Sequence, residues 1–304
     1  MDTRRLEAFT KVVDLGSVTR AASVLNIAQP ALSQQIISLE TEFSAKLLNR
    51  STRGVTPTDA GKVLYRYAKT ILRQVEEARS SVLEQKGLMV GSVSVGLAPW
   101  SSVSLLGSDL ISQIRLHHPG IRLQICDSFM IRLSEMVLNG QLDMALLYGE
   151  NPARGLSYIP VGEEQFIVAA PPGVLPRSED VVENSVLAEM PLVMPVKQSF
   201  ARLMVERACE SVNKAPDITV EVHSARNLIA ALEAGSGVTV LPIEVAETFA
   251  RITPLEIRPL AKEMRMPISL CIPDSEGLSD AAYAVYQLLE KLAHRRQRRV
   301  RETA

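Results

Sequence analysis

The chain has 304 residues, of which 46% are hydrophobic and 22% are charged, and its formal net charge is −1 at neutral pH. That length and composition are typical of a globular, soluble protein with two or three domains. No run of about 18 apolar residues predicts a membrane span, and the N-terminal segment MDTRRLEAFTKVV lacks the apolar core of a secretion signal.

The cysteines argue against a disulfide framework and against a metal site. Cys126, Cys209 and Cys271 are odd in number and have no close spacing. We therefore expect a protein of the reducing cytoplasm without metal.

The charges are distributed unevenly along the chain. Residues 1–90 carry a formal charge of +4, residues 91–290 carry −10 and residues 291–304 carry +5. A mildly basic N-terminal segment on an acidic body is compatible with a polyanion that binds the N-terminal segment alone. The C-terminal segment HRRQRRVRETA could contact DNA nonspecifically, but basic side chains also suit the negative end of a helix, and we prefer that interpretation.

Three short helices are predicted before residue 44. Hydrophobic residues at helical spacing predict a first helix that ends at Gly16, and Ser17 is a good N-cap for a second helix over residues 18–25. A tight connection of three residues follows. Because proline is tolerated at the first position of a helix, we expect Pro30 to begin the third helix and Gln29 to cap it.

The third helix has one apolar face and one face without charge. The apolar stripe consists of Leu32, Ile36, Leu39 and Phe43. The opposite face consists of Gln34 and Thr41, flanked by Pro30, Ile37 and Ser38, with Ser33 at its shoulder. Two helices joined by a three-residue turn, the second with such a face, predict a helix-turn-helix that reads DNA.

The chemistry of the uncharged face suits the major groove. Base edges present hydrogen-bond donors and acceptors there, and glutamine can pair bidentately with adenine. The positive N-terminal end of the helix also favours phosphate. The predicted DNA-binding residues of this helix are Gln29, Pro30, Ser33, Gln34 and Ser38. The alternative at this point is a three-helix packing module with a polar surface.

The segment KLLNRSTRGVTPT predicts a wing, which is a short strand, a turn at Gly54 and a returning strand. Two basic side chains, Arg50 and Arg53, belong to this segment. We expect both to bind the DNA backbone or to enter a minor groove.

A long helix is predicted after the wing. Thr58 is a good N-cap, and the helical pattern continues to about Lys86, before Gly87. Apolar residues recur at spacings of four and three, at Leu64, Ala68, Ile71, Val75, Ala78 and Val82. This spacing is typical of a coiled-coil seam, so we expect the helix to pair with a second copy of the chain. A core helix of a single globular domain is the alternative.

Strands and helices alternate after residue 90. Residues 91–149 predict strand, helix, strand, helix and strand, which implies a parallel sheet with helices on both faces. A second α/β unit begins near residue 162. Its predicted strands are residues 165–170, 218–223 and 238–242, and its predicted helices are residues 200–212 and 225–235. A strand over residues 264–273 and a helix over residues 278–296 are expected to return to the first unit. Two lobes joined by two crossovers enclose a cleft, as in periplasmic solute-binding proteins.

Candidate effector-binding residues follow from this cleft, because ligands of an open α/β sheet bind at the carboxyl ends of strands and next to helix N-termini. Residues at such positions are Trp100, Ser101, Ser102, Ser128, Ser199 and His223. Hydroxyl groups and helix dipoles suit a small anion or carboxylate. Each serine could equally be a simple helix cap, and the histidine could be a surface side chain.

No catalytic motif is recognisable. The four histidines lie outside any catalytic signature, and the GSGV segment at residues 235–238 lacks the other glycines of a dinucleotide loop. We therefore expect no enzymatic activity and no cofactor.

The N-terminal segment resembles the LysR family of transcription regulators over nearly the full length of the family's N-terminal signature. The features that carry the resemblance are Gly16-Ser17, the double alanine Ala21-Ala22, the opening Gln29 to Ser33 of the recognition helix, Leu39-Glu40 at its end, Arg50 and Arg53 in the wing, and the Thr-Pro-Thr-x-x-Gly segment from Thr56 to Gly61. One departure is Gln34, at a position where many members carry arginine.

The remainder of the chain is similar to the effector domain of the same family. The matching segments are GSVSVGLAP, LNGQLDMALLYG and EAGSGVTVLP. Within the family, the segments IAQPALSQQI, RGVTPTDAGKVLY and QLDMALLY resemble nitrogen assimilation control regulators.

This resemblance implies a domain order. Residues 1–58 are expected to form a winged helix-turn-helix domain, residues 59–87 a linker and dimerisation helix, and residues 88–304 an α/β effector domain of two lobes. Lobe one is expected over residues 88–161 and 265–304, and lobe two over residues 162–264.

The resemblance also implies a function. The expected protein is a cytoplasmic, sequence-specific transcription regulator that binds double-stranded promoter DNA, associates with the nucleoid there, and senses a small molecule in the cleft between its lobes. Homodimers formed through the linker helix are expected to join into homotetramers. The alternative is a small-molecule sensor that does not act through DNA, and the predicted reader helix argues against it.

Overall fold

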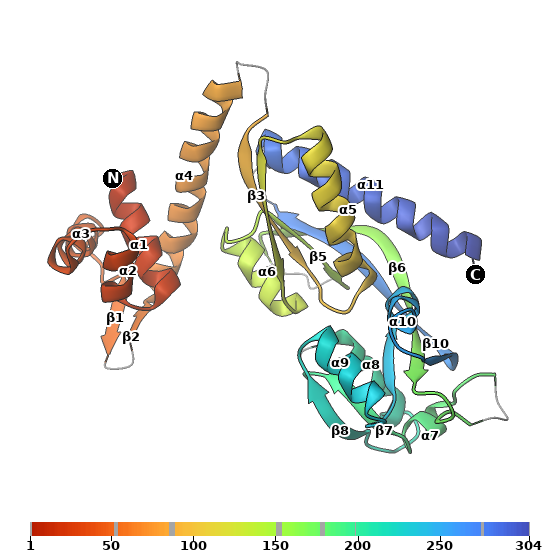
Figure 1. The fold of residues 1–304 in the computed structure, drawn as a ribbon. Coiled ribbons are helices and arrows are strands. Elements are labelled where there is room, and N and C mark those ends of the chain that lie inside the picture. The colour runs from red at the N-terminus through yellow and green to blue at the C-terminus, as the bar shows by residue number, and fades with distance from the viewer. Residues whose placement is uncertain are drawn as a thin grey trace. The chain divides into compact units, whose positions relative to one another are not determined.

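A computed structural model of the chain describes residues 2–51, 54–84, 89–149, 154–176, 180–197, 199–274 and 277–303. The chain divides into two compact units, Met1–Gly91 with Leu138–Gln141, and Ser92–Val137 with Leu142–Ala304 (Figure 1). Among the described helices, none combines the length and the apolar character that a bilayer crossing requires.

The first unit is a winged helix-turn-helix followed by a long helix. Its elements are α1 (Thr3–Leu15), α2 (Val18–Val24), α3 (Gln29–Glu42), β1 (Leu48–Ser51), β2 (Gly54–Pro57) and α4 (Asp59–Glu84). The antiparallel strands β1 and β2 form the wing, drawn as a hairpin beside the three helices in Figure 1. The predicted end of the first helix and the predicted cap of the second are confirmed. The helix α1 ends at Gly16, which has a left-handed backbone, and the side chain of Ser17 caps α2.

The start of α4 is fixed to the wing by short contacts. The hydroxyl of Thr58 accepts a hydrogen bond from the backbone N–H of Gly61 at 3.0 Å and donates one to the carbonyl of Lys46 at 2.7 Å. The prediction that Thr58 caps this helix is therefore confirmed. A Cβ atom at Gly61 would lie 2.0 Å from the carbonyl oxygen of Leu47. Glycine is therefore required here by the close approach of two backbones.

The first half of α4 belongs to the core of its own unit. Leu64, Tyr65 and Ala68 are buried together with the apolar residues of α1, α2 and α3. The prediction that Leu64 and Ala68 face a second copy of the chain is therefore wrong for this part of the seam. Periodicity identifies the apolar side of a helix but does not say whether the same chain or a partner covers it.

A polar contact reinforces this packing between α1 and α4. The hydroxyl of Tyr65 donates a hydrogen bond to the carboxylate of Asp14, and the ammonium of Lys69 lies 2.9 Å from the other oxygen of that carboxylate. The same ammonium lies 5.4 Å from the centroid of the Tyr65 ring. These contacts hold α4 to the DNA-binding helices by both polar and apolar groups.

The second unit is an α/β domain. Its elements are β3 (Gly91–Leu97), α5 (Ser102–His117), β4 (Ile121–Asp127), α6 (Met130–Leu138), β5 (Met144–Tyr148), β6 (Leu156–Ala170), α7 (Asn184–Leu187), β7 (Pro191–Pro195), α8 (Phe200–Glu210), β8 (Asp217–Val222), α9 (Ala225–Glu233), β9 (Thr239–Pro242), α10 (Ile243–Ala250), β10 (Glu256–Pro273) and α11 (Asp280–Thr303). Six strands form one sheet in the order β4-β3-β5-β10-β6-β9, and β7 pairs with β8.

The six-stranded sheet is mixed. The parallel pairing predicted within residues 91–149 is confirmed for β3 and β5. β3 and β5 are parallel, but β10 runs antiparallel to both β5 and β6. The strands β6 and β10 pair with each other along almost their whole length and pass through both lobes (Figure 1). The predicted lobe boundaries at residues 161/162 and 264/265 fall inside these two strands, so the two expected crossovers are continuous strands.

The contact between α4 and the wing generates a stability prediction. Replacing Gly61 by alanine should lower the free energy of unfolding of the N-terminal unit by about 1–3 kcal/mol, because the added methyl group overlaps the Leu47 carbonyl. Gly277 is a matched control, since a Cβ atom there meets nothing within 4 Å. The substitution G277A should change the free energy of unfolding by less than about 1 kcal/mol. Urea unfolding measures both. Equal effects of the two substitutions would contradict the proposed close approach.

Candidate DNA interface and effector cleft

The orientation of α3 follows from its apolar stripe. Leu32, Ile36 and Leu39 are fully buried in the core of the first unit, as predicted. The expectation that Phe43 continues this stripe is wrong, because α3 ends at Glu42 and Phe43 is the exposed C-cap residue. The buried stripe leaves the opposite face of α3 without cover from the residues that the structure describes.

The residues predicted to bind DNA lie on this uncovered side of α3. Gln29, Pro30 and Gln34 are exposed, and Ser33 and Ser38 are half-buried at its edges. No acidic or basic side chain lies among them.

Two hydroxyl groups on this side of α3 are occupied within the helix. The hydroxyl of Ser38 donates to the carbonyl of Gln34 at 2.8 Å, and the hydroxyl of Thr41 donates to the carbonyl of Ile37 at 2.9 Å. The hydrogen atoms of both hydroxyls therefore point back to the helix backbone in the free protein. The amide of Gln34 is exposed on the same side, and a glutamine amide can pair with the edge of an adenine.

The N-terminal end of α3 has no side-chain cap. Ala28 is the N-cap residue, Gln29 is the first helical residue and Pro30 is the second. The expectation that Gln29 caps the helix is wrong by one residue, because the extended backbone lies at Ala28, whose carbonyl accepts the N–H of Leu32 at 3.1 Å. Since the side chain of Ala28 cannot accept a hydrogen bond, it does not cap the first N–H groups of α3, which are suited to bind a phosphate oxygen.

The wing is attached to α3 by a carboxylate. Glu40 accepts the backbone N–H groups of Leu47 and Leu48 at 2.9 Å and 3.3 Å, which fixes the start of β1 against the last turns of α3. Arg50 is exposed on β1 opposite Val55, where its charge is free to approach a phosphate. The other predicted wing residue, Arg53, lies outside the described residues. The sequence pattern includes Glu40 but does not reveal this positioning contact.

A small cavity lies between the two lobes of the second unit. Its volume is about 30 Å³, which is the share of one water molecule in the liquid. Its lining residues are Ala98, Pro99, Trp100, Phe129, Met130, Tyr148, Phe166, Pro195, Ser199, Phe200, Ala201 and Leu241. None of these is charged, so the lining offers an anion few partners.

Among the predicted effector residues whose side chains the structure describes, two line this cavity. These are Trp100, which has a left-handed backbone with φ of 59°, and Ser199. Ser128 is half-buried and His223 is exposed, and neither lines the cavity. Ser102 is the first residue of α5, and its side chain lies outside the described part of the chain.

The serines next to the cavity cap helices. The hydroxyl of Ser101 accepts the N–H of Ser104 at 3.2 Å and donates to the carbonyl of Ala98, and the hydroxyl of Ser199 accepts the N–H of Arg202 at 3.2 Å. These bonds satisfy the first turns of α5 and α8. In the free protein both serines therefore act as helix caps, which was the alternative to an effector-binding role.

Aromatic side chains from both lobes close the cleft. The ring of Tyr148 lies at the end of β5. Its centroid is 6.2 Å from the ring centroid of Phe200 at the start of α8 and 5.7 Å from the ring centroid of Phe166 on β6. Both arrangements are tilted or edge-on, which is favourable for aromatic rings. A ligand larger than water would have to displace one of these rings. The sequence did not single out these three side chains, because their proximity depends on the packing of the lobes.

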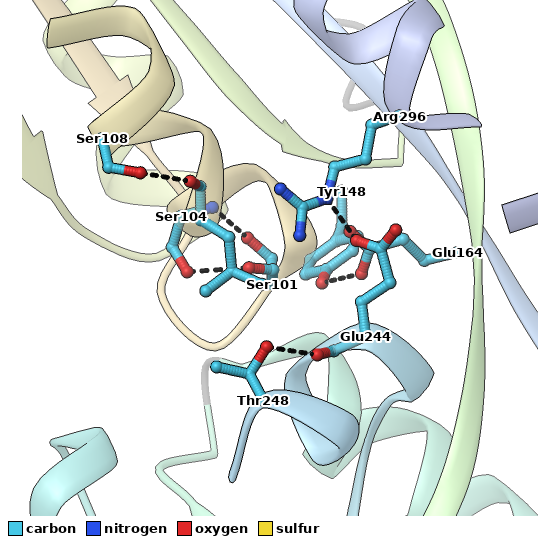
Figure 2. Close-up of polar contacts among 9 residues, drawn as sticks. Ser101, Ser104, Ser108, Tyr148, Glu164, Glu244, Thr248 and Arg296 are labelled. Carbon is cyan, nitrogen blue, oxygen red and sulfur yellow. Dashed lines mark hydrogen bonds and ion pairs between the residues drawn. The ribbon is translucent and has the colours of Figure 1, made fainter. Parts of the chain in front are cut away.

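A cluster of buried and half-buried polar side chains lies beside the aromatic contacts. The hydroxyl of Tyr148 donates a hydrogen bond to the carboxylate of Glu164, which is itself buried (Figure 2). A second polar contact joins two helices: the guanidinium of Arg296 on α11 forms an ion pair with the carboxylate of Glu244 on α10 (Figure 2). The pair ties a helix of lobe one to a helix of lobe two. No sequence pattern points to these residues, because the contacts join segments that are far apart in the chain.

This environment raises the pKa of Tyr148 well above its usual value. Burial is the largest cause, and the negative charge of Glu164 is the next. The folded protein therefore keeps the phenol protonated, as its hydrogen bond to Glu164 requires. Because the folded pKa is raised, this contribution to stability is fully present below about pH 10 and is lost as the pH rises further.

Two family models match the chain. Residues 3–62 match the model described as "Bacterial regulatory helix-turn-helix protein, lysR family", and residues 86–293 match the model described as "LysR substrate binding domain". The two matched segments together span most of the chain.

Individual proteins are similar over almost the whole length. The nitrogen assimilation regulatory protein nac of Escherichia coli (strain K12) is 38% identical over 95% of this chain and 94% of its own length. The protein of the same name from Klebsiella aerogenes is 38% identical over 97% and 96%, respectively. The crystal structure of ArgP from Mycobacterium tuberculosis superposes with a TM-score of 0.74 at 20% identity, over 96% of this chain and 97% of that chain, and this likeness shows the fold alone.

The Tyr148 contact generates a prediction that depends on pH. Replacing Tyr148 by phenylalanine should lower the free energy of unfolding of the second unit by about 1–3 kcal/mol near pH 7, because the buried Glu164 carboxylate loses a donor. Above about pH 10 the difference between the two proteins should shrink, since the wild type alone loses the Tyr148 contribution. Urea unfolding between pH 7 and pH 11 measures this.

The control is Tyr283→Phe, which removes a hydroxyl from an exposed ring and should leave the free energy of unfolding within about 0.5 kcal/mol at every pH. A difference between wild type and Tyr148→Phe that stays constant up to pH 11 would contradict the assignment.

Proposed function

Because the chain belongs to the LysR family of bacterial transcription regulators, we propose that it reads promoter DNA with α3 and couples this reading to a small molecule in the effector domain. It is a transcription regulator and not an enzyme. The observation that carries the proposal is the uncovered, uncharged side of α3, since base edges are read by hydrogen-bonding and apolar groups and not by carboxylates.

In this proposal each part of the first unit has a separate task. Gln34 reads a base edge in the major groove, and Gln29, Pro30, Ser33 and Ser38 lie around it and fix the approach of the helix. The uncapped N-terminus of α3 and the basic side chains of the wing hold phosphates. Arg53 would share the task of Arg50.

We propose that α4 also carries the dimer contact, on a different side from the one its periodicity indicates. Leu64 and Ala68 are buried in their own unit, whereas Val63 and Tyr67 are exposed. Val63 and Tyr67 are one helical turn apart and so lie on one face. Exposed apolar groups on a helix that continues beyond its core support a contact with a second copy. Assembly of two dimers into a tetramer is an expectation from the family resemblance.

The proposed effector site is the cavity between the lobes. Its uncharged, mostly apolar lining favours a ligand with an aromatic or aliphatic group over a bare anion. Entry of such a ligand displaces the ring of Phe200 or Tyr148 and thereby changes the contact between the lobes. The hydroxyl of Ser199, at the N-terminus of α8, would meet any polar group of the ligand.

We propose genes of nitrogen assimilation as targets, because the two relatives with that name cover nearly the whole chain at 38% identity. Genome-wide mapping of bound sites should place the strongest sites beside genes for the uptake or use of nitrogen sources. Strong sites that all lie beside unrelated operons would refute this assignment and leave the DNA-binding role intact.

The division of tasks between α3 and the wing predicts two different mutant phenotypes. Gln34→Ala should relax the base preference at one base pair of each half-site by about 1–3 kcal/mol. Arg50→Ala should weaken binding to all duplexes alike and reduce the slope of log K against log salt by about 1. Binding-site selection and salt titrations measure these effects. Unchanged base preferences in Gln34→Ala would remove Gln34 from the reader.

The proposed dimer contact predicts a change of mass. Tyr67→Asp should dissociate the dimer in sedimentation experiments, because it places a carboxylate in an apolar contact. Ile252→Asp is the matched control, since Ile252 is 68% exposed and Tyr67 is 63% exposed, and it should leave the mass unchanged. A dimer that survives Tyr67→Asp at micromolar concentration would place the contact elsewhere.

A further inference from the structure

One large apolar side chain lies in the middle of the uncharged side of α3. Ile37 is 45% exposed, although Leu32, Ile36 and Leu39 of the same helix are fully buried. Gln34 lies three residues before Ile37 and Thr41 lies four residues after it, so the three residues form one row along the helix. Single exposed isoleucines are common on protein surfaces, and it is the position of this one that requires a reason.

The neighbours of Ile37 offer few free donors. The hydroxyls of Ser38 and Thr41 both donate to carbonyl groups of α3. The row therefore presents to a partner one amide, from Gln34, followed by an apolar surface centred on Ile37. A partner that fits this row has a hydrogen-bonding group next to an apolar group.

The major groove of DNA contains such a combination. The 5-methyl group of thymine is the apolar group that bases expose there, and adenine exposes the donor and acceptor that suit glutamine. Three residues of an α-helix rise about 4.5 Å, and successive base pairs are about 3.4 Å apart. An adenine read by Gln34 and a thymine methyl group under Ile37 can therefore belong to neighbouring base pairs.

We propose that Ile37 is a specificity-determining residue that packs against the 5-methyl group of a thymine in each half-site, next to the base pair read by Gln34. The proposal rests on the proposed function, in which this side of α3 enters the major groove. The stiff, β-branched isoleucine side chain loses little freedom on binding, and the contact removes apolar surface of both groups from water.

The test replaces each thymine of a selected operator, one at a time, by deoxyuridine, which lacks only the 5-methyl group. Binding of the full chain is measured by fluorescence anisotropy at fixed salt. One thymine in each half-site should show about fourfold weaker binding, the loss expected for one buried methyl group. In Ile37→Ala the same replacement should have no further effect, while Gln34→Ala should retain the penalty.

Phe43→Ala is the matched control, because Phe43 is 43% exposed, close to the value for Ile37, but lies at the C-cap of α3. It should leave the deoxyuridine profile of the wild type unchanged. Ile37→Val should keep a penalty at the same thymine.

Three outcomes overturn the proposal: a wild-type profile without any methyl-sensitive thymine, an unchanged penalty in Ile37→Ala, or a change of oligomeric mass in Ile37→Ala with the penalty intact. The last would assign Ile37 to a protein contact. Failure of the proposed function is distinguishable from all three, because the wild type would then select no operator at all.

Discussion

The burial of Leu32, Ile36 and Leu39 is the constraint on which the account depends. These side chains fill the core between α1, α2 and α3, and a rotation of α3 about its axis would expose all three at a cost of several kcal/mol. The core therefore fixes which side of the helix faces outward. Without that constraint, the amide of Gln34 and the side chain of Ile37 would have no defined direction, and a sequence preference could not arise.

The same core extends into α4, and this gives the linker helix two roles. Its first half is part of the DNA-binding unit through Leu64, Tyr65 and Ala68, and Asp14 holds Tyr65 and Lys69 to α1. A helix that is packed in this way moves with the DNA-binding helices as one body. In the proposed dimer, the geometry of two α4 helices would then determine the separation of the two reader helices, and through it the spacing of half-sites.

Local rules accounted for much of the first unit and the overall order of the second. Gly16, Ser17 and Thr58 obey capping chemistry that involves neighbouring residues, so their roles were readable from the sequence. The elements that were missed are α7, which has only four residues, β7, a short strand that begins and ends at a proline, and α10, which directly follows β9. Only the last part of β6 and of β10 was expected, because their added length is stabilised by mutual pairing over a large sequence distance.

The candidate site residues also differ in whether they follow from local sequence patterns or from long-range packing. The exposed side of α3 depends on helical periodicity, and its residues were found. The cap at Ala28 and the exposure of Phe43 depend on where the helix begins and ends, which is the least certain part of a sequence reading. The cleft depends on contacts between lobes, such as that of Tyr148 with Phe200, and neither residue was named beforehand. Helix-cap serines were readable, but their hydroxyls serve the backbone.

The structure of the full chain bound to a selected operator tests the central claim most directly. The account predicts that α3 of each subunit lies in a major groove, with the side chains of Gln34 and Ile37 against base edges and Leu32, Ile36 and Leu39 still buried. A complex in which α3 points away from the bases, or in which only the wing touches the duplex, would contradict it.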